Sequence, residues 1–133
     1  MREKVLEDLR KFFENEKRVG VVYLFGSHAR GLDTVASDVD LAVLLSEVPE
    51  NFLEYYLYLV NRLSEFFGDR LDLVVLNIMP PMFKYQVIKY GKIVFCRDNR
   101  FRVMFESRAL CEYLDFRRIL EVYDRCLVER ALA

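Results

Sequence analysis

Two hydrophobic periodicities alternate along this chain. Between residues 2 and 16, apolar side chains recur at the spacing of one face of a helix. Residues 19–25 form a short run rich in β-branched and aromatic residues, which is typical of a buried strand. The later segments follow the same two patterns. They predict strands at 38–45, 71–77 and 92–96, helices at 51–67 and 80–90, and a long helical segment at about 99–132 that a break near Ser107 could divide.

These elements predict one α/β (α+β) domain that spans residues 1–133. The chain shows no internal repeat, low-complexity segment or linker. The expected architecture is a mixed or antiparallel sheet of about four strands with helices packed on it. The pattern does not fix the direction of the strands.

Composition narrows the class of protein. Hydrophobic residues make up 53% of the chain and charged residues 31%, which allows a core and a solvated surface. No run of 18 apolar residues exists and the first residues, MREKVLEDLRK, lack a signal-peptide core, so we expect a cytoplasmic protein without a membrane partner. The net charge of −1 argues against nucleic acid as the main partner.

The three cysteines do not indicate a metal site. They are far apart, no CxxC pair exists, and His28 is the single histidine. We expect Cys96, Cys111 and Cys126 to be small buried apolar residues in a reducing compartment.

The segment 24–45, LFGSHARGLDTVASDVDLAVLL, carries the candidate chemistry. Gly26 and Ser27 follow a predicted strand. A glycine there lets the backbone approach a phosphate, free N–H groups at a helix start attract anions, and the serine adds a hydroxyl donor. Taken alone the pair is weak evidence, because most Gly-Ser pairs after a strand are ordinary turns.

Asp38 and Asp40 form a second feature of this segment. They are separated by one residue at the start of a predicted strand, so alternation places both carboxylates on one face. The repulsion between them is relieved when a divalent cation such as Mg²⁺ lies between them. The alternative is that Asp38 caps a turn and Asp40 is solvated at the strand end.

Asp72 begins the predicted strand at 71–77. If that strand neighbours 38–45, its carboxylate can reach the same site, bind a second metal and accept a proton from an incoming hydroxyl. The alternative is a solvated aspartate beside Arg70. A phosphate-binding turn and three carboxylates are together the parts that nucleotidyl transfer requires.

The residues GSHARG at 26–31 and SDVDL at 37–41 resemble the GSxARG…SDxDL signature of the polymerase β-like nucleotidyltransferase superfamily. The short chain is similar to the minimal nucleotidyltransferases, the MNT or MntA-type antitoxins that pair with HEPN toxins. The resemblance implies a nucleotidyltransferase fold, ATP as substrate and two Mg²⁺ ions. It implies that Gly26 and Ser27 hold nucleotide phosphates, that Asp38 and Asp40 bind metal, and that Asp72 completes the triad.

The resemblance also implies an activity, the transfer of AMP from ATP to a tyrosine of a HEPN-type toxin partner. Arg30 is a further nucleotide-binding candidate, because its guanidinium could contact a phosphate or hold a neighbouring carboxylate. Two alternatives stay open. The chain could neutralise its partner by binding without catalysis, or it could modify a small-molecule acceptor.

A broad apolar stripe runs along the C-terminal segment. It comprises Phe116, Leu120, Tyr123 and Leu127, and Ile119, Val122 and Cys126 widen it. This face is wider than one small sheet requires of a surface helix. We expect core packing to account for most of it, and the remainder to face a protein partner or a second copy of the chain.

Overall fold

The computed structural model describes residues 3–26 and 38–133, and their elements follow the predicted order. The strand predicted at 71–77 ends two residues early and continues as a short turn, η2. The elements are α1 (Glu3–Glu14), β1 (Val19–Phe25), β2 (Val39–Leu45), α3 (Phe52–Phe67), η1 (Gly68–Arg70), β3 (Leu71–Val75), η2 (Leu76–Ile78), α4 (Pro81–Tyr90), β4 (Lys92–Cys96) and α5 (Asn99–Leu132).

The four strands form one mixed sheet in the order β3-β2-β1-β4. Strand β1 is antiparallel to both β2 and β4, whereas β2 and β3 are parallel. A parallel pair needs a crossover connection, and α3 with η1 supplies it between β2 and β3. Strand direction, which the sequence pattern left open, therefore follows from long-range pairing.

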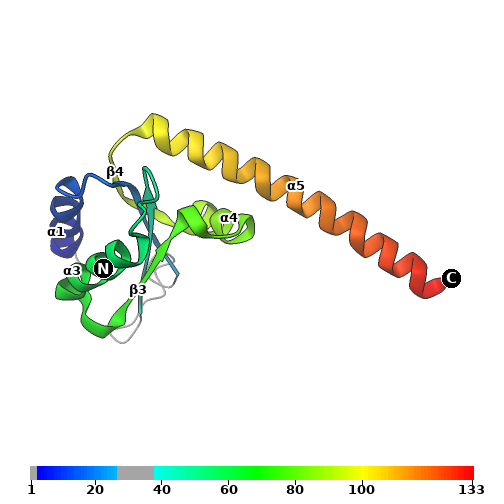
Figure 1. Ribbon diagram of the computed structural model, residues 1–133, viewed down its shortest axis with the longest axis horizontal. Helices are drawn as coiled ribbons and strands as arrows, with labels where there is room; N and C mark the ends of the chain where they lie inside the picture. Colours follow the sequence, from blue (N-terminus) through cyan, green and yellow to red (C-terminus); the bar gives the residue numbers. More distant parts are fainter. Residues whose placement is uncertain (1–2, 27–37) are drawn as a thin grey trace.

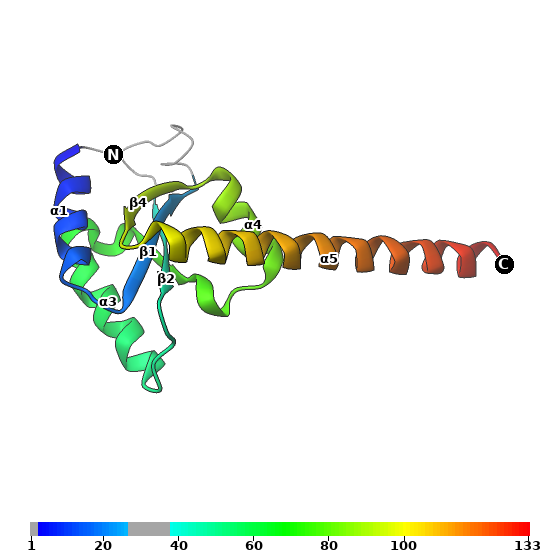
Figure 2. The same cartoon turned by 90° about the horizontal axis from the view of Figure 1, so that it is seen from above.

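Helices cover both faces of this sheet, giving three layers (Figures 1 and 2). Alternate strand residues such as Leu41 and Val43 point to one face, where they pack with Leu9 and Phe13 of α1 and with the inner side of α3. The intervening residues point to the other face, which α4 and the first turns of α5 cover. That second core contains Val21, Tyr23, Ala42, Leu44, Leu76 and Val87, with Phe25, Phe83, Cys96, Phe101 and Phe105 packed against it.

Helix α5 is one continuous helix of 34 residues, so the break considered near Ser107 is absent. Asp98 caps its N-terminus by accepting a hydrogen bond from the backbone N–H of Arg100 at 2.9 Å. Only Ala109 along its length is buried, and every residue from 114 onward is exposed. Figures 1 and 2 show this second half extending away from the other layers. The expectation that core packing accounts for most of its apolar stripe is therefore wrong.

The cysteine prediction also needs correction. All three cysteines are free thiols, but only Cys96 is partly buried, and Cys111 and Cys126 are exposed on α5. Their apolar neighbours in sequence suggested a core environment, whereas α5 leaves the core before it reaches them. Across residues 3–26 and 38–133, no helix combines the length and the apolarity needed to cross a membrane.

Candidate active site

Asp40 and Asp72 are register partners on the parallel strands β2 and β3. Their neighbours Leu41 and Leu73, which are also paired, point into the core on the α1 and α3 side. Because side chains alternate along a strand, both aspartates lie on the opposite face, the one that α4 and α5 partly cover. The adjacency of these strands, on which the interpretation of Asp72 depended, is therefore present in the fold.

Gly26 lies directly against Asp40, one member of this pair. It follows Phe25, which is the register partner of Asp40 in the antiparallel β1–β2 ladder. Its φ of 75° is in the left-handed region that favours glycine, and a Cβ there would collide with Oδ2 of Asp40. Only a residue without a Cβ can therefore lie this close to the Asp40 carboxylate.

The three predicted carboxylates differ in exposure. Asp40 is half-buried, whereas Asp38 and Asp72 are exposed. Asp38 precedes the first residue of β2, so the strand ladder does not set the direction of its side chain. Within residues 3–26 and 38–133, no three acidic, histidine or cysteine side chains converge into a set of metal ligands.

The donor chemistry of the site nevertheless fits Mg²⁺. The two carboxylates on paired positions of β2 and β3 present only oxygen donors, and that of Asp72 is exposed. Magnesium is usually bound by one or two carboxylates together with substrate phosphates and water. Asp40 and Asp72, with Asp38 two residues earlier in the chain, match that requirement without a complete protein cage.

Two predicted nucleotide-binding residues, Ser27 and Arg30, lie outside the described residues, as do His28 and Ser37. The described structure therefore places Gly26, Asp38, Asp40 and Asp72 among the predicted site residues. It brings Gly26, Asp40 and Asp72 to one end of the sheet.

Contacts around β1 hold the site face in place. The ring of Phe25 packs edge-on against Phe83 of α4, with 5.7 Å between ring centroids. Two residues earlier, the Tyr23 hydroxyl donates to Oε1 of Glu106 on α5 at 2.8 Å. Burial and the adjacent Glu106 carboxylate raise the pKa of Tyr23. Sequence reasoning missed this link because its partners are 83 residues apart and neither belongs to a motif.

Asn77 is a second position that sequence reasoning missed. From η2, its side-chain amide donates to the Leu45 carbonyl at 2.8 Å and its carbonyl accepts from the Leu45 N–H at 2.8 Å. The side chain thereby makes the two hydrogen bonds to the Leu45 backbone that a neighbouring strand would otherwise make at the end of β2. A polar residue directly after an apolar strand was the available signal, although such residues are common in turns.

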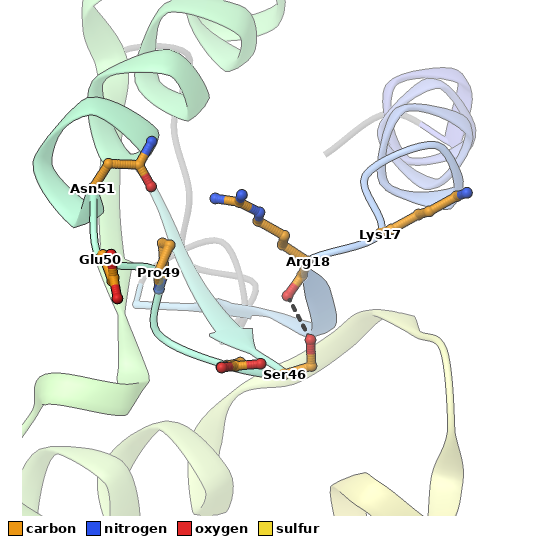
Figure 3. Close-up of a pocket in the computed structure, with 7 residues that line it drawn as sticks. Lys17, Arg18, Ser46, Pro49, Glu50 and Asn51 are labelled. Carbon is orange, nitrogen blue, oxygen red and sulfur yellow. Dashed lines mark hydrogen bonds between the residues drawn. The ribbon is translucent and has the colours of Figure 1, made fainter.

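A hollow of about 430 Å³ lies at the opposite end of β1 and β2 from Asp40 (Figure 3). Ser46 donates a hydrogen bond to the Arg18 carbonyl at 3.2 Å across its base. Two basic and two acidic side chains line it, so neither charge is in excess. The lining residues are Lys17, Arg18, Ser46, Glu47, Pro49, Glu50 and Asn51.

The chain matches the family described as polymerase beta, nucleotidyltransferase over residues 7–100. It is 30% identical over 89 residues to the protein adenylyltransferase MntA of Shewanella oneidensis. That alignment covers 67% of this chain and 60% of the relative, so the chain spans about three fifths of the length of that protein.

Two solved structures contain chains with a fold similar to that of this chain. A chain of a toxin–antitoxin structure with AMP-PNP superposes with a TM-score of 0.68 at 22% identity, covering 100% of both chains. A chain of the tri-AMPylated HEPN toxin of Shewanella oneidensis in complex with MNT antitoxin superposes with a TM-score of 0.66 at 20% identity, also over 100% of both. The family match spans all four strands and the register pair Asp40 and Asp72. This chain belongs to the polymerase β nucleotidyltransferase family.

Proposed function

We propose that this chain is a Mg²⁺-dependent protein adenylyltransferase that moves AMP from ATP to a tyrosine of a HEPN-type toxin and thereby acts as its antitoxin. The observation that carries the proposal is the register pairing of Asp40 with Asp72 beside Gly26. These residues belong to a chain whose GSxARG…SDxDL signature is intact. ATP is available in the cytoplasm, where we propose that the protein acts.

The reaction requires an attack by the acceptor oxygen on the α-phosphorus of ATP. A new oxygen–phosphorus bond forms, the bond from the α-phosphorus to the bridging oxygen breaks, and pyrophosphate leaves with that oxygen. The hydroxyl proton must be removed as the bond forms. Asp72 is exposed at the site and is suited to accept it.

Asp38, Asp40 and Asp72 would together hold the two Mg²⁺ ions that we propose for the reaction. When bound, Mg²⁺ would neutralise charge on the phosphates and favour the ionised form of the acceptor hydroxyl. The carboxylates contribute by fixing donor positions on rigid strands. Rigid placement matters because transfer depends on alignment of the attacking oxygen, the phosphorus and the leaving group.

The choice of acceptor rests on the relatives. The Shewanella oneidensis relative is named as a protein adenylyltransferase, and both solved structures described above are of toxin–antitoxin complexes. One of them contains an AMPylated HEPN toxin. This chain also carries an exposed apolar helix of a kind that suits a protein acceptor better than a small molecule.

Intact-mass spectrometry of a purified HEPN-type protein, sought among the products of the neighbouring genes, tests the proposal. Incubation with this chain, ATP and Mg²⁺ should add one or more AMP masses to that protein. Asp40→Asn and Asp72→Asn should each slow the addition by at least about a hundredfold. Asp69→Asn is the matched control, because Asp69 is an exposed aspartate three residues before Asp72 on η1 rather than on the sheet.

The outcomes separate the remaining alternatives. A tight complex without any mass gain would replace catalysis by stoichiometric binding. AMP-PNP binding without a mass gain on the protein would redirect the search to small-molecule acceptors. Full activity in a folded Asp40→Asn, Asp72→Asn double variant would remove the carboxylate mechanism altogether.

A further inference from the structure

The two halves of α5 differ in what they contact. The first half, residues 99–113 and here called the root, is bound firmly to the domain. Glu106 accepts a hydrogen bond from the Tyr23 hydroxyl of β1 at 2.8 Å, and the Tyr113 ring stacks on Tyr85 of α4 at 4.0 Å with an interplanar angle of 4°. The domain therefore fixes the direction in which the rest of α5 projects.

The second half, residues 114–132 and here called the tail, makes no such hydrogen bond or ring stack with the other described residues, 3–26 and 38–113. All of its residues are exposed, including large apolar side chains. Most helical stability in proteins comes from packing of an apolar face, and none of the described residues (3–26 and 38–113) buries the apolar side chains of the tail. The stripe is defined by Phe116, Leu120, Tyr123 and Leu127, which are 39%, 37%, 60% and 44% exposed.

The stripe continues the row of root residues that packs on the domain. Ala109, which is buried, and Tyr113, which stacks on α4, precede Phe116 by seven and three residues. Positions at alternating spacings of three and four lie on one side of a helix. The stripe of the tail therefore lies on the same side of α5 as Tyr113, which is the side that contacts α4.

This orientation determines where a partner would lie. A molecule that covers the stripe would lie next to α4. It would be on the same face of the sheet as Asp40 and Asp72. We propose that the stripe is the docking face for the protein acceptor, which receives the tail in an apolar groove and is thereby held on the catalytic side of the sheet. This proposal rests on the function proposed above.

The stripe is poorly suited to pairing with a second copy. It covers only two heptads, and Arg130 occupies the next position of the row, whereas a stable two-stranded coil needs about three to four apolar heptads. Ile119 and Cys126 widen the apolar face beyond a two-helix seam. A wide face matches a groove between helices of another protein, the arrangement in which an amphipathic helix is bound on several sides.

Paired charge substitutions on α5 test the docking face. The stripe variant is Leu120→Asp with Leu127→Asp. The matched control is Leu114→Asp with Val128→Asp, which introduces the same two charges at positions 51% and 57% exposed and away from the stripe. The probe is the same purified HEPN-type protein as in the mass-spectrometry experiment, and complex formation is followed by size-exclusion chromatography with light scattering.

The stripe variant should bind the probe about a hundredfold more weakly than the control does. AMP transfer should show a raised KM for the probe with kcat retained, and AMP-PNP affinity should stay at its wild-type value in both variants. Circular dichroism verifies that both remain helical. If the wild type shows no transfer, loss of the complex in the stripe variant alone still supports docking, so the two proposals fail separately.

Two results would overturn the docking face. One is a stripe variant that binds and modifies the probe as the wild type does. The other is a stripe variant that binds the probe normally but converts a dimer of this chain into a monomer, which would assign the stripe to a second copy.

Discussion

The backbone at Gly26 lies against the carboxylate of Asp40, with no room for a Cβ between them. The contact joins the end of β1 to the start of β2, because Phe25 and Asp40 are register partners. A glycine in the signature therefore has a steric role in addition to any role in phosphate binding. It allows the half-buried aspartate to keep its place on the strand.

Gly26→Ala should therefore reduce both stability and transfer. The positive φ adds strain on the order of 1–3 kcal/mol, and the new methyl group displaces the Asp40 carboxylate. A displacement of about 1 Å at a reacting centre lowers the rate by roughly a hundredfold. Urea denaturation and the AMP-transfer rate measure the two effects.

Gly68→Ala separates the effect of backbone strain from the effect of a collision with Asp40. Gly68 also has a positive φ, 62°, but a Cβ there meets nothing within 4 Å. This variant should lose a similar amount of stability and keep full transfer activity. Equal loss of activity in both variants would refute the steric role of Gly26.

The link between Tyr23 and Glu106 predicts a dependence of stability on pH. Burial and Glu106 raise the pKa of Tyr23 in the folded protein above the ordinary tyrosine value of about 10. Stability from this group is complete below that value and falls as the pH rises through it, because the unfolded chain then releases a proton that the folded chain retains. The free energy of unfolding should thus decrease from about pH 10 upward.

Tyr23→Phe should flatten this alkaline decrease and lower stability at pH 7 by about 0.5–1.5 kcal/mol through loss of the hydrogen bond. Glu106→Gln keeps an acceptor but removes the charge, so it should reduce the decrease by a smaller amount. Tyr55, whose pKa burial and Glu16 also raise, adds a second alkaline contribution. Urea midpoints between pH 7 and 10.5 test this, and an unchanged slope in Tyr23→Phe would contradict it.

Much of the fold could be predicted from the sequence because its signals are local. The apolar run before Gly26 and the prolines at the start of α4 mark element ends within a few residues. The Asp40–Asp72 register is different, since it depends on which strands pair and in which direction. No local pattern encodes that pairing, and the placement of Asp72 remained conditional for this reason.

Helix α5 shows a second limit of prediction from the sequence. Its periodicity predicted a helix correctly, but a broad apolar face looks the same whether it packs on its own domain or on another protein. Cys111 and Cys126 were expected to be buried for the same reason. The distinction depends on where the helix leaves the domain, and the contacts at Tyr85 and Tyr113 set that point.

Asn77→Ala should destabilise the domain without altering the site directly. The substitution leaves the N–H and C=O of Leu45 without their partners, both at 2.8 Å in the wild type. Leaving buried polar groups unpaired costs about 1–3 kcal/mol each, less where water reaches them. Urea unfolding should show this loss, while the transfer rate of the folded fraction stays at the wild-type value. Asn51→Ala is the control, because the Asn51 side chain makes no capping hydrogen bond on α3.

The exposed cysteines provide a probe of the docking face. Cys126 widens the stripe, whereas Cys111 is also exposed on α5 but points away from the row of Ala109 and Tyr113. Both thiols should react with maleimide in the isolated chain, at rates that peptide mapping can follow. Addition of the HEPN-type protein should protect Cys126 and leave Cys111 reactive, because only the first would enter the partner groove. Equal protection of both thiols would mean that the partner surrounds α5 rather than binding one side, and equal reactivity would mean that it binds elsewhere.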